Sequence, residues 1–141
     1  MRSTIRRRVL GVMAAVLVSG WAFNATAHGE DEAVGIKPLL AKELAGHADE
    51  QVSMTQVTYA PGASSKPHQH HGPVFVYVVE GIVELQIKGG PLTTVHAGET
   101  FYEPPGAVHV VSRNASATEP AKLVAFIVGK AGTPVTSPVA E

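Results

Sequence analysis

The sequence contains no cysteine, few aromatic residues, no excess of basic side chains, and no apolar run long enough to span a bilayer comfortably. Without cysteine, the chain cannot form disulfides, thiolate metal sites or a cysteine nucleophile. Its 141 residues allow a single domain at most. A domain of this size without disulfides depends on its hydrophobic core for stability.

The first 27 residues have the features of a signal peptide. Arginines at positions 2, 6, 7 and 8 precede an apolar run from Val9 to Val18, and Ala25-Thr26-Ala27 fits a small-residue cleavage site. We therefore predict cleavage after Ala27 and export to the periplasm or out of the cell; the alternative is an uncleaved anchor. The stretch from Arg6 to Leu10 approximates a twin-arginine signal, which leaves the twin-arginine and general secretory routes both open.

The charge of the processed chain argues against two classes of partner. All twelve carboxylates lie beyond residue 27, but only seven of the eleven basic residues do, so the net charge after cleavage is −5 with neutral histidines. A protein with this charge is not expected to bind nucleic acid. It is also not expected to bind an anionic membrane once the signal has been removed.

Beyond residue 50 the pattern is typical of short β-strands. Apolar residues alternate or run continuously in segments separated by turn signals such as Pro61-Gly62 and Gly89-Gly90. The run from Val74 to Val79 is continuously apolar and predicts a strand buried on both faces. Many short strands at this spacing predict an all-β sandwich or barrel, with strands over residues 52–59, 74–79, 83–87, 92–96, 100–102, 108–111 and 123–128.

This pattern divides the processed chain into three parts. Residues 28–50 are predicted to be an N-terminal arm, in which Ile36 to Gly46 reads either as a short helix or, by preference, as extended chain. Residues 51–128 are predicted to form the barrel. Residues 129–141 show no core pattern and are predicted to be a flexible tail.

Three histidines are candidates for a metal site. If the chain around them is extended, His68 and His70 point to the same face and His71 to the other. A pair of imidazoles on one face suits a metal ion, although a surface histidine run that chelates adventitiously has the same pattern. His109 follows two prolines and a glycine that can direct its strand back toward the pair. His71 is expected at the rim.

Several other side chains are predicted to lie in the core or at the surface without a role in the metal site. Glu99 and Glu103 share a parity and are predicted to be solvated. Phe101 and Tyr102 alternate, so one should face the interior and the other should cover it. The remaining histidines, at positions 28, 47 and 96, have no partners in the sequence and are predicted to lie at the surface.

From about Val52 to Val128 the chain resembles the cupins, which are double-stranded β-helix proteins of the jelly-roll type. The first cupin motif, G-x5-H-x-H-x3-4-E-x6-G, is matched at Gly62, His68, His70 and Gly81. The second, G-x5-P-x-G-x2-H-x3-N, is matched at Gly98, Pro104, Gly106 and His109. Two positions depart from the pattern: Val74 stands at the glutamate position, and Arg113 stands at the asparagine position, with Asn114 one residue later.

The resemblance implies one divalent metal ion held by His68, His70 and His109, without a carboxylate ligand. In this respect the chain is similar to the three-histidine cupins, which include iron(II) dioxygenases. Three neutral imidazoles suit iron(II), which is preferred here, and also copper, nickel, zinc or cobalt; manganese is the metal least suited to a site without a carboxylate.

The resemblance also implies a function and an assembly. We expect a metal-dependent oxidoreductase of the iron(II) dioxygenase type that acts on a small molecule, since three protein ligands leave coordination positions open. A metal-assisted isomerase or hydrolase would use the same ligands. The alternative from another class is a non-catalytic module that binds a metal or a small ligand. Family resemblance further suggests a homodimer.

Overall fold

The computed structural model describes residues 33–139, so the predicted signal peptide and its cleavage site lie outside the described residues. Within this range the chain forms ten strands and no helix, and hence no helix able to cross a membrane. This confirms the predicted all-β class. The strands are β1 (Val34–Glu43), β2 (Glu50–Tyr59), β3 (His68–Gln69), β4 (Val74–Glu80), β5 (Ile82–Ile87), β6 (Thr93–His96), β7 (Thr100–Glu103), β8 (Val108–Asn114), β9 (Ala121–Lys130) and β10 (Ser137–Pro138).

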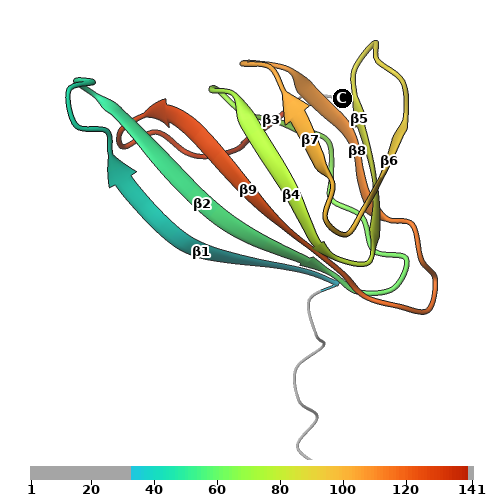
Figure 1. Ribbon diagram of the computed structural model, residues 1–141. Helices are drawn as coiled ribbons and strands as arrows, with labels where there is room; N and C mark the ends of the chain where they lie inside the picture. Colours follow the sequence, from blue (N-terminus) through green and yellow to red (C-terminus); the bar gives the residue numbers. More distant parts are fainter. Residues whose placement is uncertain (1–32, 140–141) are drawn as a thin grey trace, which may run out of the picture. The chain divides into compact units, whose positions relative to one another are not determined.

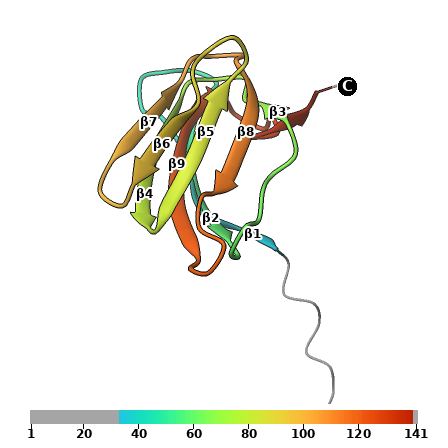
Figure 2. The same cartoon turned by 90° about the vertical axis from the view of Figure 1, so that its right-hand side faces the viewer.

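The strands form two antiparallel five-stranded sheets with the connectivity of a jelly roll (Figures 1 and 2). One sheet has the order β1-β2-β9-β4-β7, and the other has the order β10-β3-β8-β5-β6. The buried core draws on both sheets, with Val76 and Leu123 from the first and Val83 and Leu85 from the second. The core therefore lies between the sheets.

Strand β4 is buried on one face only, which corrects the prediction of two buried faces. Val74, Val76 and Val78 are fully or almost fully buried, whereas Phe75, Tyr77 and Val79 remain about half exposed. Because side chains alternate along a strand, one face of β4 packs into the core and the other lies on the outer surface of its sheet. The apolar composition of that outer face is what made the strand resemble one buried on both sides.

Strand β1 confirms the preference for extended chain over a helix between residues 36 and 46. It pairs with β2 along its length, with a register shift between Pro38 and Leu40. Pro38 has no N–H to donate, and an edge strand is where a sheet tolerates such a residue. Residues 34–43 of the predicted arm are thus the edge strand of the first sheet.

The segment after residue 128 differs from the predicted tail. β9 continues to Lys130, and β10 pairs with β3 through Ser137 opposite Gln69 and Pro138 opposite His68. Val135 packs against the core. These contacts use backbone groups and a single apolar side chain, so they leave no periodic pattern that a sequence reading could detect.

The turn after the histidine pair is held against β9. A side chain at Gly72 would overlap the carbonyl oxygen of Val128. The amide of Val128 also donates a hydrogen bond to the carbonyl of Pro73, at 3.2 Å. Only glycine allows the backbone to approach this closely, and the approach fixes the position of the chain between His71 and β4.

Candidate metal centre

The structure brings His68, His70 and His109 together. His68 lies in β3, directly opposite His109 of the neighbouring strand β8, and His70 follows β3. The ring centroids of His68 and His70 are 5.0 Å apart, and those of His68 and His109 are 5.3 Å apart. Alternation along the chain places His70 on the same side as His68. The pairing of β3 with β8 then places His109 beside His68.

Two of the three rings have a fixed tautomer. The Nδ1 of His68 donates to the carbonyl of Lys66 at 2.9 Å, and the Nδ1 of His70 donates to the carbonyl of Val135 at 2.6 Å. A carbonyl oxygen can only accept, so the proton is on Nδ1 and the lone pair on Nε2 in each neutral ring. This is the arrangement in which backbone carbonyls orient histidines that bind a metal through Nε2.

Burial keeps the ring of His68 neutral over a wider pH range than usual. Loss of hydration lowers the pKa of His68 from its ordinary value, and the nearby rings of His109 and His70 lower it further, although the bond to Lys66 opposes them. A neutral imidazole is the form that coordinates a metal ion.

Glu103 is buried, which corrects the prediction that it is solvated. It is 2% exposed; its Oε1 lies 3.2 Å from His109 Nδ1, and its Oε2 lies 3.9 Å from His70 Nε2. Phe101 packs against the core and Tyr102 is half exposed, so Glu103 shares the inward face of Phe101. Its apolar neighbour two residues earlier was the sequence signal for this placement. Glu99, which precedes β7, is exposed as predicted.

Buried polar atoms without hydrogen-bond partners show whether these residues suit a metal ion. Among residues 33–139, three buried side-chain atoms have no hydrogen-bond partner: Glu103 Oε2, His109 Nδ1 and His109 Nε2. Buried polar atoms normally have hydrogen-bond partners. Three atoms without one at a single point therefore indicate a ligand that binds them. Imidazole nitrogens and a carboxylate oxygen fit a divalent cation. Within residues 33–139, however, no three such side chains already have the geometry of a formed site, so binding requires side-chain adjustment.

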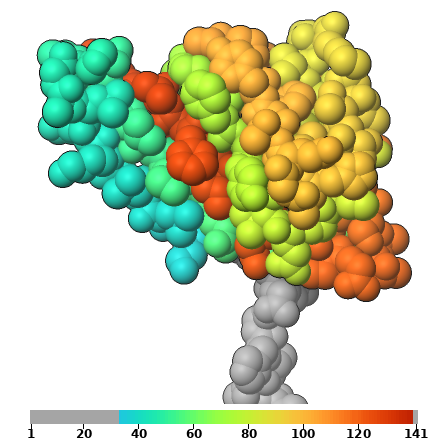
Figure 3. Space-filling view, in the orientation of Figure 1, coloured from blue at the N-terminus to red at the C-terminus, as the bar shows by residue number. Residues whose placement is uncertain are grey.

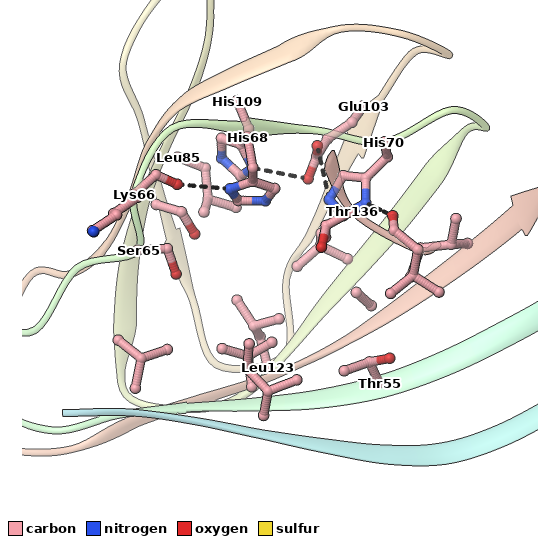
Figure 4. A pocket seen from close by; sticks show the side chains of 18 of the residues that line it. Thr55, Ser65, Lys66, His68, His70, Leu85, Glu103, His109, Leu123 and Thr136 are labelled. Carbon is pink, nitrogen blue, oxygen red and sulfur yellow. Dashed lines mark hydrogen bonds and ion pairs between the residues drawn. The ribbon is translucent and has the colours of Figure 1, made fainter. Parts of the chain in front are cut away.

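These residues lie at one end of a cavity of about 420 Å³ between the sheets (Figure 4). The opposite wall is mostly apolar and includes Leu123, with Thr55 beside it. A few polar groups above an apolar floor are typical of sites for small molecules, and the volume falls within the usual range.

A second polar group lines the cavity wall. The hydroxyl of Tyr59 lies 2.7 Å from Ser112 Oγ and 2.9 Å from Ser65 Oγ. Burial raises the pKa of Tyr59, while its bonds to Ser112 and Ser65 act in the opposite direction. Tyr59 therefore remains a neutral hydroxyl at the wall.

The other histidines lie away from the cavity. His71 is exposed, and its Nε2 lies 2.8 Å from Ser137 Oγ, which agrees with a position at the rim. His47 and His96 are exposed beside Glu50 and Glu99, as predicted for surface residues. His28 lies outside the described residues.

The displaced asparagine has a structural explanation. In the pairing of β5 with β8, Gln86 faces Val111 but Ile87 faces His109, so Val110 is an extra residue in β8. Such a bulge reverses the alternation beyond it. Asn114 is therefore buried, and its amide donates to the carbonyls of Ala60 and Glu119.

Comparison with known proteins connects this geometry to a family. Residues 55–127, just over half of the chain, match the family model described as a cupin domain. Germin-like protein 1-1 of Oryza sativa subsp. japonica is 39% identical over 67 residues, which cover 41% of this chain and 29% of that protein. The chain spans between 29% and 36% of the length of the curated relatives it matches.

Solved structures share the same fold. The DMSP lyase DddQ of Ruegeria pomeroyi superposes with a TM-score of 0.62 at 18% identity, over 75% of this chain and 51% of that one. An oxalate oxidase in complex with the substrate analogue glycolate gives a TM-score of 0.52 at 26% identity, over 73% of this chain and 57% of that one. Enzymes of different reaction types therefore share this arrangement of strands.

Proposed function

The chain belongs to the cupin family, and from that premise we propose that it is a metal-dependent oxidoreductase of the iron(II) dioxygenase type acting on a small molecule. The observation that carries the proposal is the convergence of His68, His70 and His109 at one end of an apolar cavity. Cupins usually bind a metal, and the likeness to an oxalate oxidase supports redox chemistry on a small molecule.

Different residues of the chain would bind the metal ion, orient its ligands and receive the substrate. His68, His70 and His109 would hold the ion, and the carbonyls of Lys66 and Val135 orient the first two. When bound, a divalent metal supplies Lewis acidity and, as iron(II), activation of dioxygen. The apolar wall excludes water and receives the carbon skeleton of the substrate, while the Tyr59 hydroxyl is available as a hydrogen-bonding group in the cavity.

Oxygen consumption tests this function. Purified protein loaded with iron(II) is incubated in an oxygen electrode with a panel of small hydroxy acids, diketones and catechols, and His109→Ala serves as the matched control. We expect uptake with at least one compound, and none with the variant. The absence of uptake across the panel by protein that contains stoichiometric iron would contradict the oxidoreductase.

The second candidate is a non-catalytic module that binds a metal or a small ligand. It is favoured by the incomplete geometry of the donor atoms within residues 33–139. Such a module would show ligand-dependent stabilisation without turnover, so the same iron-loaded sample distinguishes the two functions.

We also propose that the protein is exported. The carrying observation is the basic and apolar segment that ends at Ala27. Mass spectrometry of protein from its native cells should find an N-terminus at His28. Retention of precursor by the Arg6→Lys, Arg7→Lys double variant would identify the twin-arginine route, and normal export would identify the general secretory route.

A further inference from the structure

We propose that Glu103 is a metal ligand and supplies, from the neighbouring strand, the carboxylate that the first cupin motif lacks at Val74. This inference rests on the metal site of the proposed function. It changes that site from three histidines to three histidines and a carboxylate, and with it the metals that the protein is expected to prefer.

The position of Glu103 follows from strand pairing. Val74 of β4 lies directly opposite Glu103 of β7. Residues that face each other in an antiparallel pair project from the same side of the sheet, with Cβ atoms about 5 Å apart. A long side chain at Glu103 can therefore deliver its oxygens to the interior space beside Val74, and Val74 is fully buried there.

The contacts of Glu103 indicate an ion rather than a structural bond. Its side chain is 3% exposed, yet no positively charged side chain within the described residues pairs with it, and its Oε2 has no hydrogen-bond partner. In the part of the chain that the structure describes, the basic groups near the carboxylate are two imidazole nitrogens, His70 Nε2 and His109 Nδ1. An unpaired buried carboxylate is costly, and a cation at this point would remove the cost.

The distances are compatible with shared coordination. Two donors bonded to one ion at about 2.1 Å cannot lie farther apart than about 4.2 Å. Glu103 Oε2 is 3.9 Å from His70 Nε2, and Glu103 Oε1 is 3.2 Å from His109 Nδ1. Both separations meet this limit, and Figure 4 shows the Glu103 carboxylate directed at the rings of His70 and His109.

The added oxygen donor has a consequence for metal choice. Carboxylate ligands favour manganese, whereas imidazole ligands suit iron(II), copper, nickel or zinc. We therefore expect manganese, which the motif alone made the least suitable metal, to bind well.

Calorimetric titration of the metal-free full chain with Mn²⁺ and with Zn²⁺ tests this role. Glu103→Gln keeps the size of the side chain and removes the charge. We expect it to weaken Mn²⁺ binding at least tenfold and Zn²⁺ binding less. The matched control is Glu99→Gln, which lies at the surface beside His96 and should bind both metals as the parent does. Thermal melting of each metal-free protein shows whether the variant is folded.

A rescue variant separates ligation from a role in orienting His109. In the Glu103→Gln background, Val74→Glu should restore Mn²⁺ affinity, since it places a carboxylate on the opposite strand position. If folded Glu103→Gln binds Mn²⁺ as tightly as the parent, the inference is wrong and the three-histidine site stands. If the parent itself binds neither metal, the proposed metal-dependent function fails along with it. Loss of Mn²⁺ affinity without any rescue would overturn direct ligation.

Discussion

Tyr59 is a buried hydroxyl held between two serines, and its ionisation links stability to alkaline pH. Burial raises its pKa in the folded protein above the ordinary value of 10.0. The unfolded chain then loses this proton first as the pH rises, so stability is retained below pH 10 and lost above it.

We expect Tyr59→Phe to remove that alkaline loss and to cost about 1–2 kcal/mol of stability at neutral pH, because Ser112 and Ser65 lose a partner. Urea unfolding of parent and variant from about pH 8 to about pH 11 gives both quantities. Parallel pH profiles for the two proteins would show that Tyr59 does not carry the linkage.

Substitutions of His109 and His71 are expected to differ sharply in their effect on stabilisation by bound metal. Metal that binds only the folded chain stabilises it by about 2.7 kcal/mol at a hundredfold excess over Kd. His109→Ala should lose most of this stabilisation, whereas His71→Ala, at the exposed rim, should keep it. Differential scanning calorimetry with metal and then with a chelator measures the change in Tm. Equal metal-dependent shifts in the parent and His109→Ala would remove His109 from the site.

At the scale of elements, β10 and the chain before it form a strap over the histidine strand. The strap covers residues 131–138; its Val135 carbonyl accepts the bond from His70, and its Ser137 lies against His71. Val135 and Thr136 also line the cavity. The strap therefore acts as a positioning element for His70.

Truncation after Lys130 should weaken metal binding about 10- to 100-fold, the usual effect of removing a partner that orients a metal-binding histidine. Ser137→Ala, which removes only the contact with His71, should bind as the parent does. Equilibrium dialysis, in which the bound and free metal are both quantified, gives the metal affinity of the parent, the truncated chain and Ser137→Ala. A truncated chain that remains folded and binds with parental affinity would show that the strap does not position His70.

At the scale of elements, the sequence predicts features that depend on one strand alone and misses those that depend on contacts between strands. The alternation of residues along a single strand is local, so the shared face of His68 and His70 follows from the sequence. The run from Val74 to Val79 is apolar at every position, so the sequence does not show which face of β4 is buried. The inward side of Glu103 has a signal in the sequence, because Phe101 lies two residues earlier on the same face of β7. Its approach to His70 and His109 depends on the packing of separate strands, and the strap acts through backbone atoms, so neither of these contacts leaves a pattern along its own segment. The bulge at Val110 is likewise visible only once β8 is aligned with β5.

At the scale of the whole molecule, the outer face of the first sheet is rich in apolar side chains. Phe75, Tyr77, Val79 and Tyr102 are each about half exposed, and the rings of Phe75 and Tyr102 are 5.3 Å apart. Figure 3 shows this sheet as one continuous surface, with β9 in red between β2 and β4. Monomeric proteins seldom leave such a patch uncovered.

We expect this face to form the interface of a homodimer. Phe75→Glu should convert the dimer to a monomer in size-exclusion chromatography with light scattering, with little change in the protomer's own packing. Leu92→Glu, at an exposed apolar residue between β5 and β6, is the matched control and should stay dimeric. A parent protein that is monomeric at all accessible concentrations would rule out this interface.

The close contact between Gly72 and the carbonyl of Val128 has a consequence for any saturation mutagenesis of this protein. Position 72 should reject every replacement, and it lies two residues from His70, so a screen for activity alone would score it like a residue of the site. Its intolerance is steric, because any added side chain meets the backbone of β9. Cellular abundance measured for the same library would show the difference: variants at 72 should be depleted as protein, whereas those at His109 should accumulate as inactive protein.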